Sequence, residues 1–231
     1  MRDLSTFKGC PAPTPVTLKG RFVTVEPYDR EKHLQALWHG LGDEGINPLL
    51  TYFTQPDFAG VGDFDAWLTG VQSKGGWVTH VFRDNKTGNV VGMASYMRAD
   101  PANGVVEVGG VAHGPAMSRT PLATEAHYLM ARNIFDDLGY RRYEWKCHNE
   151  NEPSKTTAQR YGFSFEGIFR QHMLSKGKSR DTAWFSIIDG EWPVVKAAFE
   201  AWLSPENFDA EGKQIRRLED IRAGLTAGGA A

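Results

Sequence analysis

The periodicity of the sequence changes between residues 105 and 137, which read VVEVGGVAHGPAMSRTPLATEAHYLMARNIFDD. Residues 105–111 form the apolar run of a strand, interrupted by the carboxylate of Glu107. From residue 121 onward the apolar side chains recur at helical spacing instead, at Leu122, Ala126, Leu129, Met130 and Ile134. We therefore expect a strand that leads into an amphipathic helix over 121–137, which ends near Gly139.

The residues before this stretch predict a short meander of strands preceded by two helices. We expect a strand over 18–27, a helix over 30–40 with Asp29 as its N-cap, and a second short helix over 64–71. Strands over 77–82, 90–96 and 105–111 follow, and turns at 84–89 and 100–104 join them.

The residues after the stretch complete an alternation of strands and helices. Strands are expected over 142–147, 163–174 and 181–188, with a short helix over 153–161 that Gly162 closes. The element order predicts an α/β (α+β) domain over 16–190, a mixed sheet with helices on both faces. Residues 1–15 carry three prolines and are expected to form an extended, weakly structured leader. Residues 191–231 predict a helical extension, with helices over 193–203 and 214–222 and a frayed tail from residue 224.

Composition narrows the classes of function. The 231 residues carry a formal net charge of −2, which gives no general attraction for nucleic acid or an anionic membrane. No apolar run approaches the roughly 20 residues that span a bilayer, and the first residues lack the apolar core of a signal peptide. The only cysteines, Cys10 and Cys147, are expected to be free thiols in a reducing cytoplasm. No Cys/His cluster has the spacing of zinc ligands, so no metal site is expected.

Several short motifs together carry a family resemblance. They are residues 123–126 (ATEA), Asn151 with Ser154, residues 161–163 (YGF), residues 166–167 (EG) and residues 180–186 (RDTAWFS). With these motifs at these spacings, the chain resembles the GNAT superfamily of N-acetyltransferases, in the branch that includes ribosomal-protein N-terminal acetyltransferases. The resemblance rests mainly on residues 105–190. It implies a mostly antiparallel sheet with a splayed central strand pair and acetyl-CoA as the cosubstrate.

The resemblance also implies where acetyl-CoA binds. The pantetheine arm would lie along the strand edge at Val111, Ala112 and His113. The pyrophosphate would lie at the start of the central helix, near Ser118, Arg119, Thr120, Ala123 and Thr124, where unpaired amides favour anions. In this family the loop usually has the sequence Q/R-x-x-G-x-G/A, whereas Arg119 and Pro121 occupy the two glycine positions here. Hydroxyl and guanidinium donors could replace the lost amides, or Arg119 could be an ordinary solvated loop residue.

Two residues are candidates for catalysis. Glu107 could take the proton of the acceptor amine, or it could be half of a structural ion pair. Ser154 could assist the leaving thiolate while Asn151 contacts pantetheine. Asn151 precedes Pro153 and would also suit the N-cap region of the helix over 153–161, and the two interpretations are compatible. His172 is a weaker candidate for the base, and Cys147 is better explained as a core thiol than as a nucleophile.

Other side chains have plainer explanations. Glu125 can be explained by the helix dipole alone. Four aromatic residues could wall an acceptor pocket or belong to the core: Trp38, Tyr52, Phe53 and Trp67.

The expected function is transfer of an acetyl group from acetyl-CoA to a primary amine by direct attack. The acceptor would be a peptide or protein N-terminus or a small amine, and a homodimer is compatible with the branch. Two alternatives stay open. One is a non-catalytic acyl-CoA-binding or partner-binding module of the same fold, and the other is a likeness of fold without CoA binding.

Overall fold

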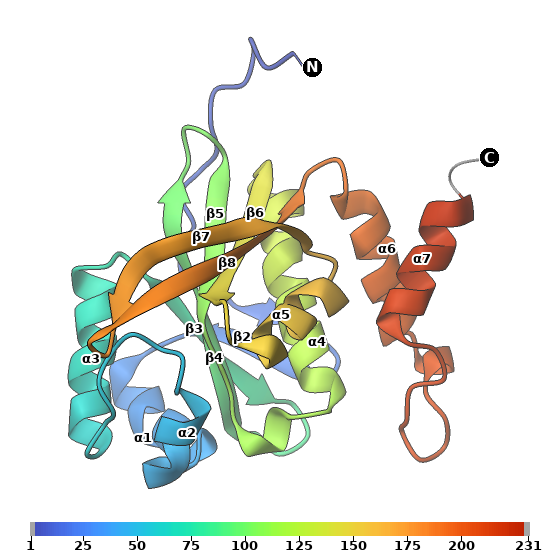
Figure 1. Ribbon diagram of the computed structural model, residues 1–231. Helices are drawn as coiled ribbons and strands as arrows, with labels where there is room; N and C mark the ends of the chain where they lie inside the picture. Colours follow the sequence, from blue (N-terminus) through green and yellow to red (C-terminus); the bar gives the residue numbers. More distant parts are fainter. Residues whose placement is uncertain (1–2, 229–231) are drawn as a thin grey trace.

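The computed structural model describes residues 3–228, and its centre is one eight-stranded sheet (Figure 1). The strand order is β1-β2-β3-β4-β5-β6-β8-β7, and every neighbouring pair is antiparallel except β5 and β6. The strands are β1 Leu18–Lys19, β2 Val23–Pro27, β3 Val78–Asp84, β4 Val90–Asp100, β5 Val105–His113, β6 Arg142–His148, β7 Ser164–Ser175 and β8 Lys178–Ile188. The expected mixed, mostly antiparallel sheet is confirmed.

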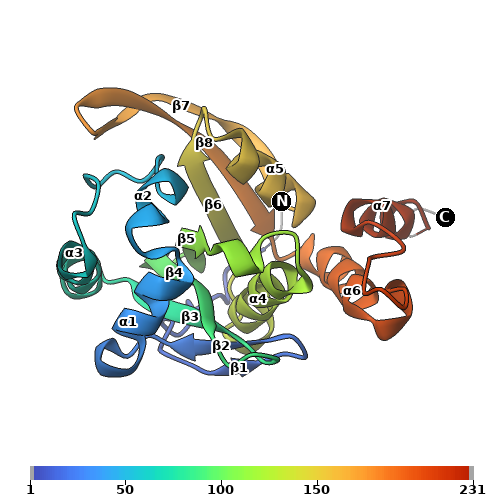
Figure 2. The same cartoon turned by 90° about the horizontal axis from the view of Figure 1, so that it is seen from below.

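Seven α-helices are present in residues 3–228. They are α1 Arg30–Gly40, α2 Ile46–Leu49, α3 Val61–Ser73, α4 Pro121–Arg132, α5 Glu152–Arg160, α6 Trp192–Leu203 and α7 Leu218–Gly228. Figures 1 and 2 show α1, α2 and α3 on one side of the sheet and α4 on the other, with α6 and α7 beyond α4. None of these helices is both long and apolar enough to cross a bilayer.

Each face of the sheet has its own hydrophobic cluster because successive side chains of a strand point to opposite faces. On β3, Val81 packs toward α1–α3, whereas Phe82 packs toward α4. Asp29 caps α1 as expected, accepting from the amides of Glu31 and Lys32. The helical face of α4 is buried as its periodicity predicted, and α4 continues into one π-helical turn, Asn133–Asp137.

The central strands β5 and β6 separate after a short parallel contact. Their register runs from Val105 opposite Arg142 to Val108 opposite Trp145. β5 then continues to His113 and β6 to His148, but within residues 3–228 no further residues of the two strands pair with each other. Past Val108, β5 is therefore paired with β4 alone, and its other edge faces the gap. This is the splayed strand pair that the resemblance implied.

Two expectations at the start of the domain were wrong in detail. Residues 18–27 form a hairpin of β1 and β2 and not one strand, because the chain reverses between Lys19 and Val23. The Glu125 carboxylate on α4 holds this turn by accepting from the amides of Arg21, Phe22 and Val23 at 2.8, 2.6 and 2.9 Å. The helix dipole is thus not the explanation for Glu125.

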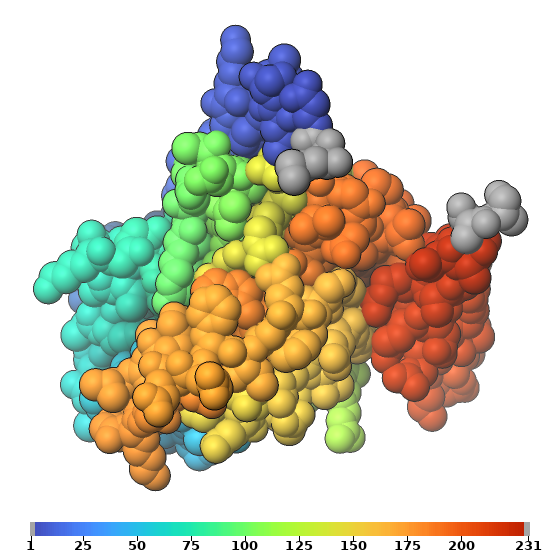
Figure 3. All heavy atoms as spheres, turned by 45° about the horizontal axis from the view of Figure 1, so that its top comes forward, coloured from blue at the N-terminus to red at the C-terminus, as the bar shows by residue number. Residues whose placement is uncertain are grey.

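The two ends of the chain pack against the domain. The leader is extended as expected, but it is docked: the Cys10 amide donates to the Pro101 carbonyl and the Tyr140 hydroxyl donates to the Pro11 carbonyl. Figure 3 shows the leader over the β4–β5 turn. At the other end α7 begins later than expected and extends to Gly228, so residues 224–228 are helical and not frayed. The rest of the expected tail, residues 229–231, lies outside the described residues.

The C-terminal extension shares the main core. Trp192, Phe199 and Trp202 of α6 and Ile221 of α7 belong to the same hydrophobic cluster as α4. Arg222 of α7 also donates to carbonyls at the end of α5. α2 was not predicted, because it is a single helical turn within a segment interrupted by glycine and proline.

Candidate active site

A cavity of about 260 Å³ lies where β5 and β6 separate. Its walls come from β5, β6, the β7–β8 hairpin, the start of α5 and the segment that follows α2. Of the expected site residues, Glu107, Val111, Asn151 and Ser154 all line this cavity. The structure therefore brings both proposed catalytic residues and part of the proposed cofactor site to one place.

The edge of β5 toward the cavity carries a β-bulge. Met93 and Ser95 of β4 are two residues apart in the sequence, whereas their partners on β5, Ala112 and Gly109, are three apart. β5 therefore has one extra residue here. Gly110 in this bulge has a φ of +59°, and a Cβ there would approach the Trp77 ring to 2.6 Å. Glycine suits both constraints. The bulge turns the strand directly beside the gap, where backbone amides are available to a ligand.

Of the three residues expected along the pantetheine, only Val111 lines the cavity. Ala112 is buried, and the His113 ring points into the core, with its Nε2 atom 3.0 Å from Nε2 of His127. Burial lowers the pKa of His113 to about 4 and holds the pKa of His127 well below its ordinary value. A role of Ala112 and His113 in binding would therefore use their backbone.

Glu107 is both buried and ion-paired. Its side chain is only 4% exposed and lines the cavity. Nη1 of Arg98 lies 3.0 and 2.9 Å from its two oxygens, and Nζ of Lys146 lies 2.9 Å from Oε2. Lys146 also lies 2.7 Å from Glu144, which in turn pairs with Arg142. The two interpretations of Glu107, as a cavity carboxylate and as an ion-pair partner, both describe its geometry.

Asn151 and Ser154 form the start of α5. The Asn151 carboxamide oxygen accepts from the Ser154 amide at 3.1 Å, so the capping interpretation is confirmed. The Ser154 hydroxyl oxygen accepts from the Trp145 indole N–H at 2.9 Å. Because the indole N–H can only donate, the O–H of Ser154 keeps its own proton to offer. This hydroxyl lies at the cavity wall, on the β6 side of the gap.

Cys147 lies beside Ser154 but lacks the features of a nucleophile. Its side chain is buried, and burial raises the pKa of its thiol, although Ser154 partly opposes this shift. A catalytic cysteine requires the opposite shift. The expectation of a core thiol fits this environment.

The loop before α4 holds the other expected cofactor residues. Ser118 and Arg119 are exposed, and Arg119 has a φ of +59°, a backbone conformation that favours glycine. The residue at this family glycine position is thus arginine, held in a backbone conformation that favours glycine. α4 begins at Pro121 without a side-chain cap. Its first-turn amides, beginning at Leu122, have no such cap to compete with an anion.

The remaining residues of this loop and helix start are more enclosed. The Thr120 hydroxyl donates to the Met117 carbonyl at 2.8 Å, and Ala123 is half-buried. Thr124 is buried, and its hydroxyl accepts from Arg160 at 2.9 Å. Thr124 therefore contributes to the packing of α5 against α4, and its hydroxyl is already engaged.

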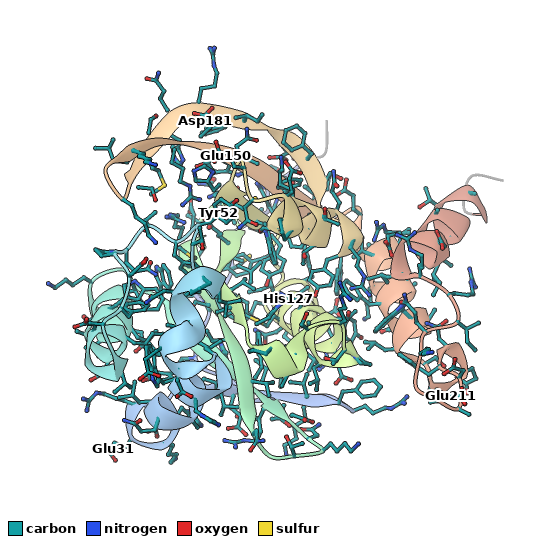
Figure 4. The ribbon with its side chains drawn as sticks, turned by 60° about the horizontal axis from the view of Figure 1, so that its bottom comes forward. Glu31, Tyr52, His127, Glu150, Asp181 and Glu211 are labelled. Carbon is teal, nitrogen blue, oxygen red and sulfur yellow. The ribbon has the colours of Figure 1, made fainter. Side chains whose placement is uncertain are left out.

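Aromatic residues line the side of the cavity away from α4. Tyr52 and Phe53 line it, whereas Trp38 and Trp67 pack in the hydrophobic cluster of α1–α3. The Tyr52 hydroxyl donates to the Glu150 carbonyl at 3.2 Å, which links the α2 segment to the loop before α5 (Figure 4).

His172 reaches the cavity because β7 has a bulge between Phe169 and Met173. Its Nδ1 atom lies 3.0 Å from the Thr182 hydroxyl.

Three cations that line the cavity were not predicted as site residues: Arg98, Lys146 and Arg180. The sequence pattern could have indicated Lys146. Charged residues of β6 alternate with Tyr143, Trp145 and Cys147, so the charged side chains share one face of a central strand and require oppositely charged partners. Arg180 begins the motif of residues 180–186, but that motif carried only the family resemblance and did not indicate a cavity residue. Arg98 carried no comparable signal.

Comparison with known protein families and solved structures identifies the family of this chain. The family model described as an acetyltransferase (GNAT) domain matches residues 23–164. A GCN5-related N-acetyltransferase from Brucella melitensis is 44% identical with a TM-score of 0.91, over 95% of this chain and 100% of the other. A probable acetyltransferase of the GNAT family from Chromobacterium violaceum is 32% identical with a TM-score of 0.76, over 84% and 96%.

A more distant solved structure shows the fold alone. It is an acetyltransferase from Salmonella typhimurium that modifies the N-terminal serine of ribosomal protein L7/L12, 16% identical with a TM-score of 0.64 over 75% of this chain and 99% of the other. No curated protein sequence matches the chain. The family model and the two closer structures nevertheless agree, and they agree with the splayed strands and the helix start described above. The chain belongs to the GNAT family of N-acetyltransferases, enzymes that take their acetyl group from acetyl-CoA.

Proposed function

We propose that this enzyme transfers the acetyl group of acetyl-CoA directly to a primary amine in the cavity between β5 and β6. The observation that carries the proposal is the position of this cavity: the unpaired edge of β5, the Ser154 hydroxyl and the buried Glu107 all border it. Pantetheine would hydrogen-bond to the β5 edge as an added strand does. Its pyrophosphate would lie on the first turn of α4, with Ser118 and Arg119 as further donors.

The bulge in β5 supports a site for the thioester carbonyl. Amine attack places negative charge on that oxygen, and fixed backbone N–H groups stabilise such charge. The amides at Gly110 and Val111 lie at the bulge and at the cavity wall. The C–N bond forms as the C–S bond breaks, and the Ser154 O–H donates a hydrogen bond to the departing sulfur, which takes its proton from solvent.

Glu107 would accept the proton that the amine loses and release it to solvent. The two cations that pair with Glu107 also act on the amine. Arg98 and Lys146 disfavour an ammonium ion beside them, so they lower the pKa of the bound amine. The neutral amine required for attack is then available at neutral pH.

The acceptor would be a peptide or protein N-terminus or a small amine. The likeness of fold to the Salmonella enzyme is compatible with a ribosomal-protein N-terminus, and the open cavity admits the end of a chain. Both cysteines are free thiols, which supports the expected location in a reducing cytoplasm.

The test is incubation of the protein with acetyl-CoA and a panel of amines: N-terminal peptides, polyamines, aminoglycosides and amino acids. We expect release of CoA thiol together with a mass increase of one acetyl group on at least one acceptor. We also expect a thermal shift, because ligand at about 100 times its Kd stabilises the fold by about 2.7 kcal/mol. Stabilisation by acetyl-CoA without transfer to any amine would favour the non-catalytic binding module instead.

A further inference from the structure

The charged residues around the cavity are balanced except for Arg180. Arg98, Lys146 and Arg142 form a continuous network of ion pairs with the three carboxylates of Glu107, Glu144 and Glu166. Three positive charges thus meet three negative charges. Arg180, on β8, lines the same cavity and is outside this network.

Arg180 is held in an environment that does not suit an isolated cation. Its Nε atom is buried without a hydrogen-bond partner, and in residues 3–228 no carboxylate oxygen lies within ion-pair distance of its guanidinium. Burial is the main reason that its pKa is lowered from the ordinary value; Cys147 and the Glu107 carboxylate partly oppose this shift, and the nearby Arg98 adds to it. A buried donor without a partner is costly, so its retention at the wall of a binding cavity indicates a partner that arrives with the ligand.

Acetyl-CoA does not supply this partner under the proposed function, because its phosphates would lie at α4. Arg180 lines the cavity together with Thr182, His172 and Trp184 of the β7–β8 hairpin, and none of these residues belongs to α4 or to the loop before it. The missing charge is therefore expected on the acceptor. One unbalanced cation matches one negative charge, and the guanidinium fork matches a carboxylate in shape as well as charge.

We propose that the acceptor amine carries a carboxylate near its amino group and that Arg180 binds this carboxylate. This inference rests on the proposed function and narrows its substrate class. The carboxylate has two possible sources: the α-carboxylate of a free amino acid, or an acidic side chain next to the N-terminal residue of a peptide.

The experiment compares acceptors that differ only in this charge. One pair is a free amino acid and its α-carboxamide, and the other is a tripeptide with Asp or with Asn at its second position. We expect the carboxylate member of at least one pair to have the higher kcat/KM, and the responding pair identifies the source. Equal or better turnover of both uncharged members would overturn the inference.

Variants then locate the effect on Arg180. Arg180→Gln should lower kcat/KM for the carboxylate acceptor by about 10- to 150-fold, the range for a lost hydrogen bond to a charged group. It should leave the uncharged acceptor and the KM for acetyl-CoA unchanged, while Arg180→Lys should recover part of the loss. Lys178→Gln removes an exposed cation two residues away on β8 and should change nothing. Equal losses for charged and uncharged acceptors would contradict a role in recognition.

A binding measurement keeps the inference separate from catalysis. The N-acetylated amino acid and the N-acetylated Asp peptide should raise the melting temperature of the wild-type protein, and at least one should do so more than its uncharged counterpart. Arg180→Gln should abolish that difference. If transfer to every amine fails, the proposed function is contradicted, and this measurement still decides whether Arg180 binds a carboxylate. Equal shifts for the charged and uncharged ligands would rule out that role.

Discussion

Nζ of Lys146 on β6 lies 2.9 Å from Oε2 of Glu107 on β5, at the point where these two strands begin to separate. Lys146 also lies 2.7 Å from Glu144 and 3.9 Å from the centre of the Trp184 ring. The lysine therefore has two anionic partners, and Glu107 has two cationic ones. Removal of the Lys146 charge would leave Glu107 paired with Arg98, and Glu144 paired with Arg142. Removal of the Glu107 charge would leave Lys146 paired with Glu144, but it would leave the half-exposed Arg98 without an ion-pair partner among residues 3–228.

This shared pairing predicts how Glu107→Gln behaves. If Glu107 takes the amine proton, turnover should fall by about 10²–10⁴-fold. The free energy of unfolding should fall by only about 1–2 kcal/mol and not by the 3–5 kcal/mol typical of a stranded buried charge, because Lys146 keeps Glu144 and Arg98 is half-exposed. Both quantities are measured on one preparation.

Glu166→Gln is the matched control for Glu107. Glu166 belongs to the same ion network through Arg142 but is outside the cavity lining. We expect a small loss of stability and unchanged turnover. A Glu107→Gln enzyme that keeps its specific activity while losing much of its stability would identify Glu107 as a structural carboxylate.

Glu125→Gln should destabilise the fold more than substitution of an exposed carboxylate. The Glu125 side chain accepts from three backbone amides of the β1–β2 turn, and it is buried. A carboxamide has one acceptor oxygen and presents its own N–H groups to these donors, so we expect a loss of about 2–4 kcal/mol in urea unfolding. Glu152→Gln, at the exposed first turn of α5, should lose at most about 1 kcal/mol. Equal losses would show that the three hydrogen bonds from the turn to Glu125 contribute little to stability.

Buried histidines should make the fold sensitive to acid. Burial lowers the pKa of His80 and of His113 from 6.5 to about 4. Between these values the unfolded chain binds protons that the folded chain does not. Stability is therefore fully present above pH 6.5 and is lost as the pH falls toward 4. At about 1.4 kcal/mol per pKa unit, each group contributes at most about 3–4 kcal/mol to this loss.

The measurement is the free energy of unfolding at a series of pH values across this window. His80→Gln should make the free energy of unfolding less dependent on pH, because this variant lacks one of the buried imidazoles that take up a proton on unfolding. His39→Gln, on the surface of α1, should leave the slope unchanged. A slope that is the same in both variants and in the wild type would place the acid sensitivity elsewhere.

Much of the fold could be predicted because its periodic elements are long. The apolar side chains expected on one face of α4 are buried, and β6 has nearly the expected bounds and alternation. The β1–β2 hairpin could not be predicted, because Gly20 lies inside an alternating run and the carboxylate that fixes its turn comes from Glu125, about a hundred residues later. Local periodicity carries no information about such a long-range partner.

The site was predictable where one residue broke a local rule. Glu107 stood out because it interrupts an apolar run, and Ser154 because it follows Asn151 at a helix start. Arg98, an ion-pair partner of Glu107, did not stand out in the sequence. A bulge near the end of β4, where Arg98 has a φ of +47°, directs its side chain to Glu107. The partners of Glu107 depend on strand register and bulges, which the sequence pattern alone does not specify.

Arg119 tests whether a side chain has replaced the glycine of the pyrophosphate loop. Its φ of +59° suits glycine, so Arg119→Gly removes the guanidinium without straining the backbone, whereas Arg119→Ala removes it and keeps a Cβ. If the guanidinium contacts phosphate, both variants should raise the KM for acetyl-CoA, with a loss of about 1.5–3 kcal/mol, and leave the KM for the acceptor unchanged. Addition of salt should weaken acetyl-CoA binding by the wild type more than by either variant, because an exposed charge pair is screened. If only the backbone amides of α4 bind the pyrophosphate, Arg119→Gly should match the wild type in KM and in salt dependence, and Arg119 would then be a surface residue of the loop.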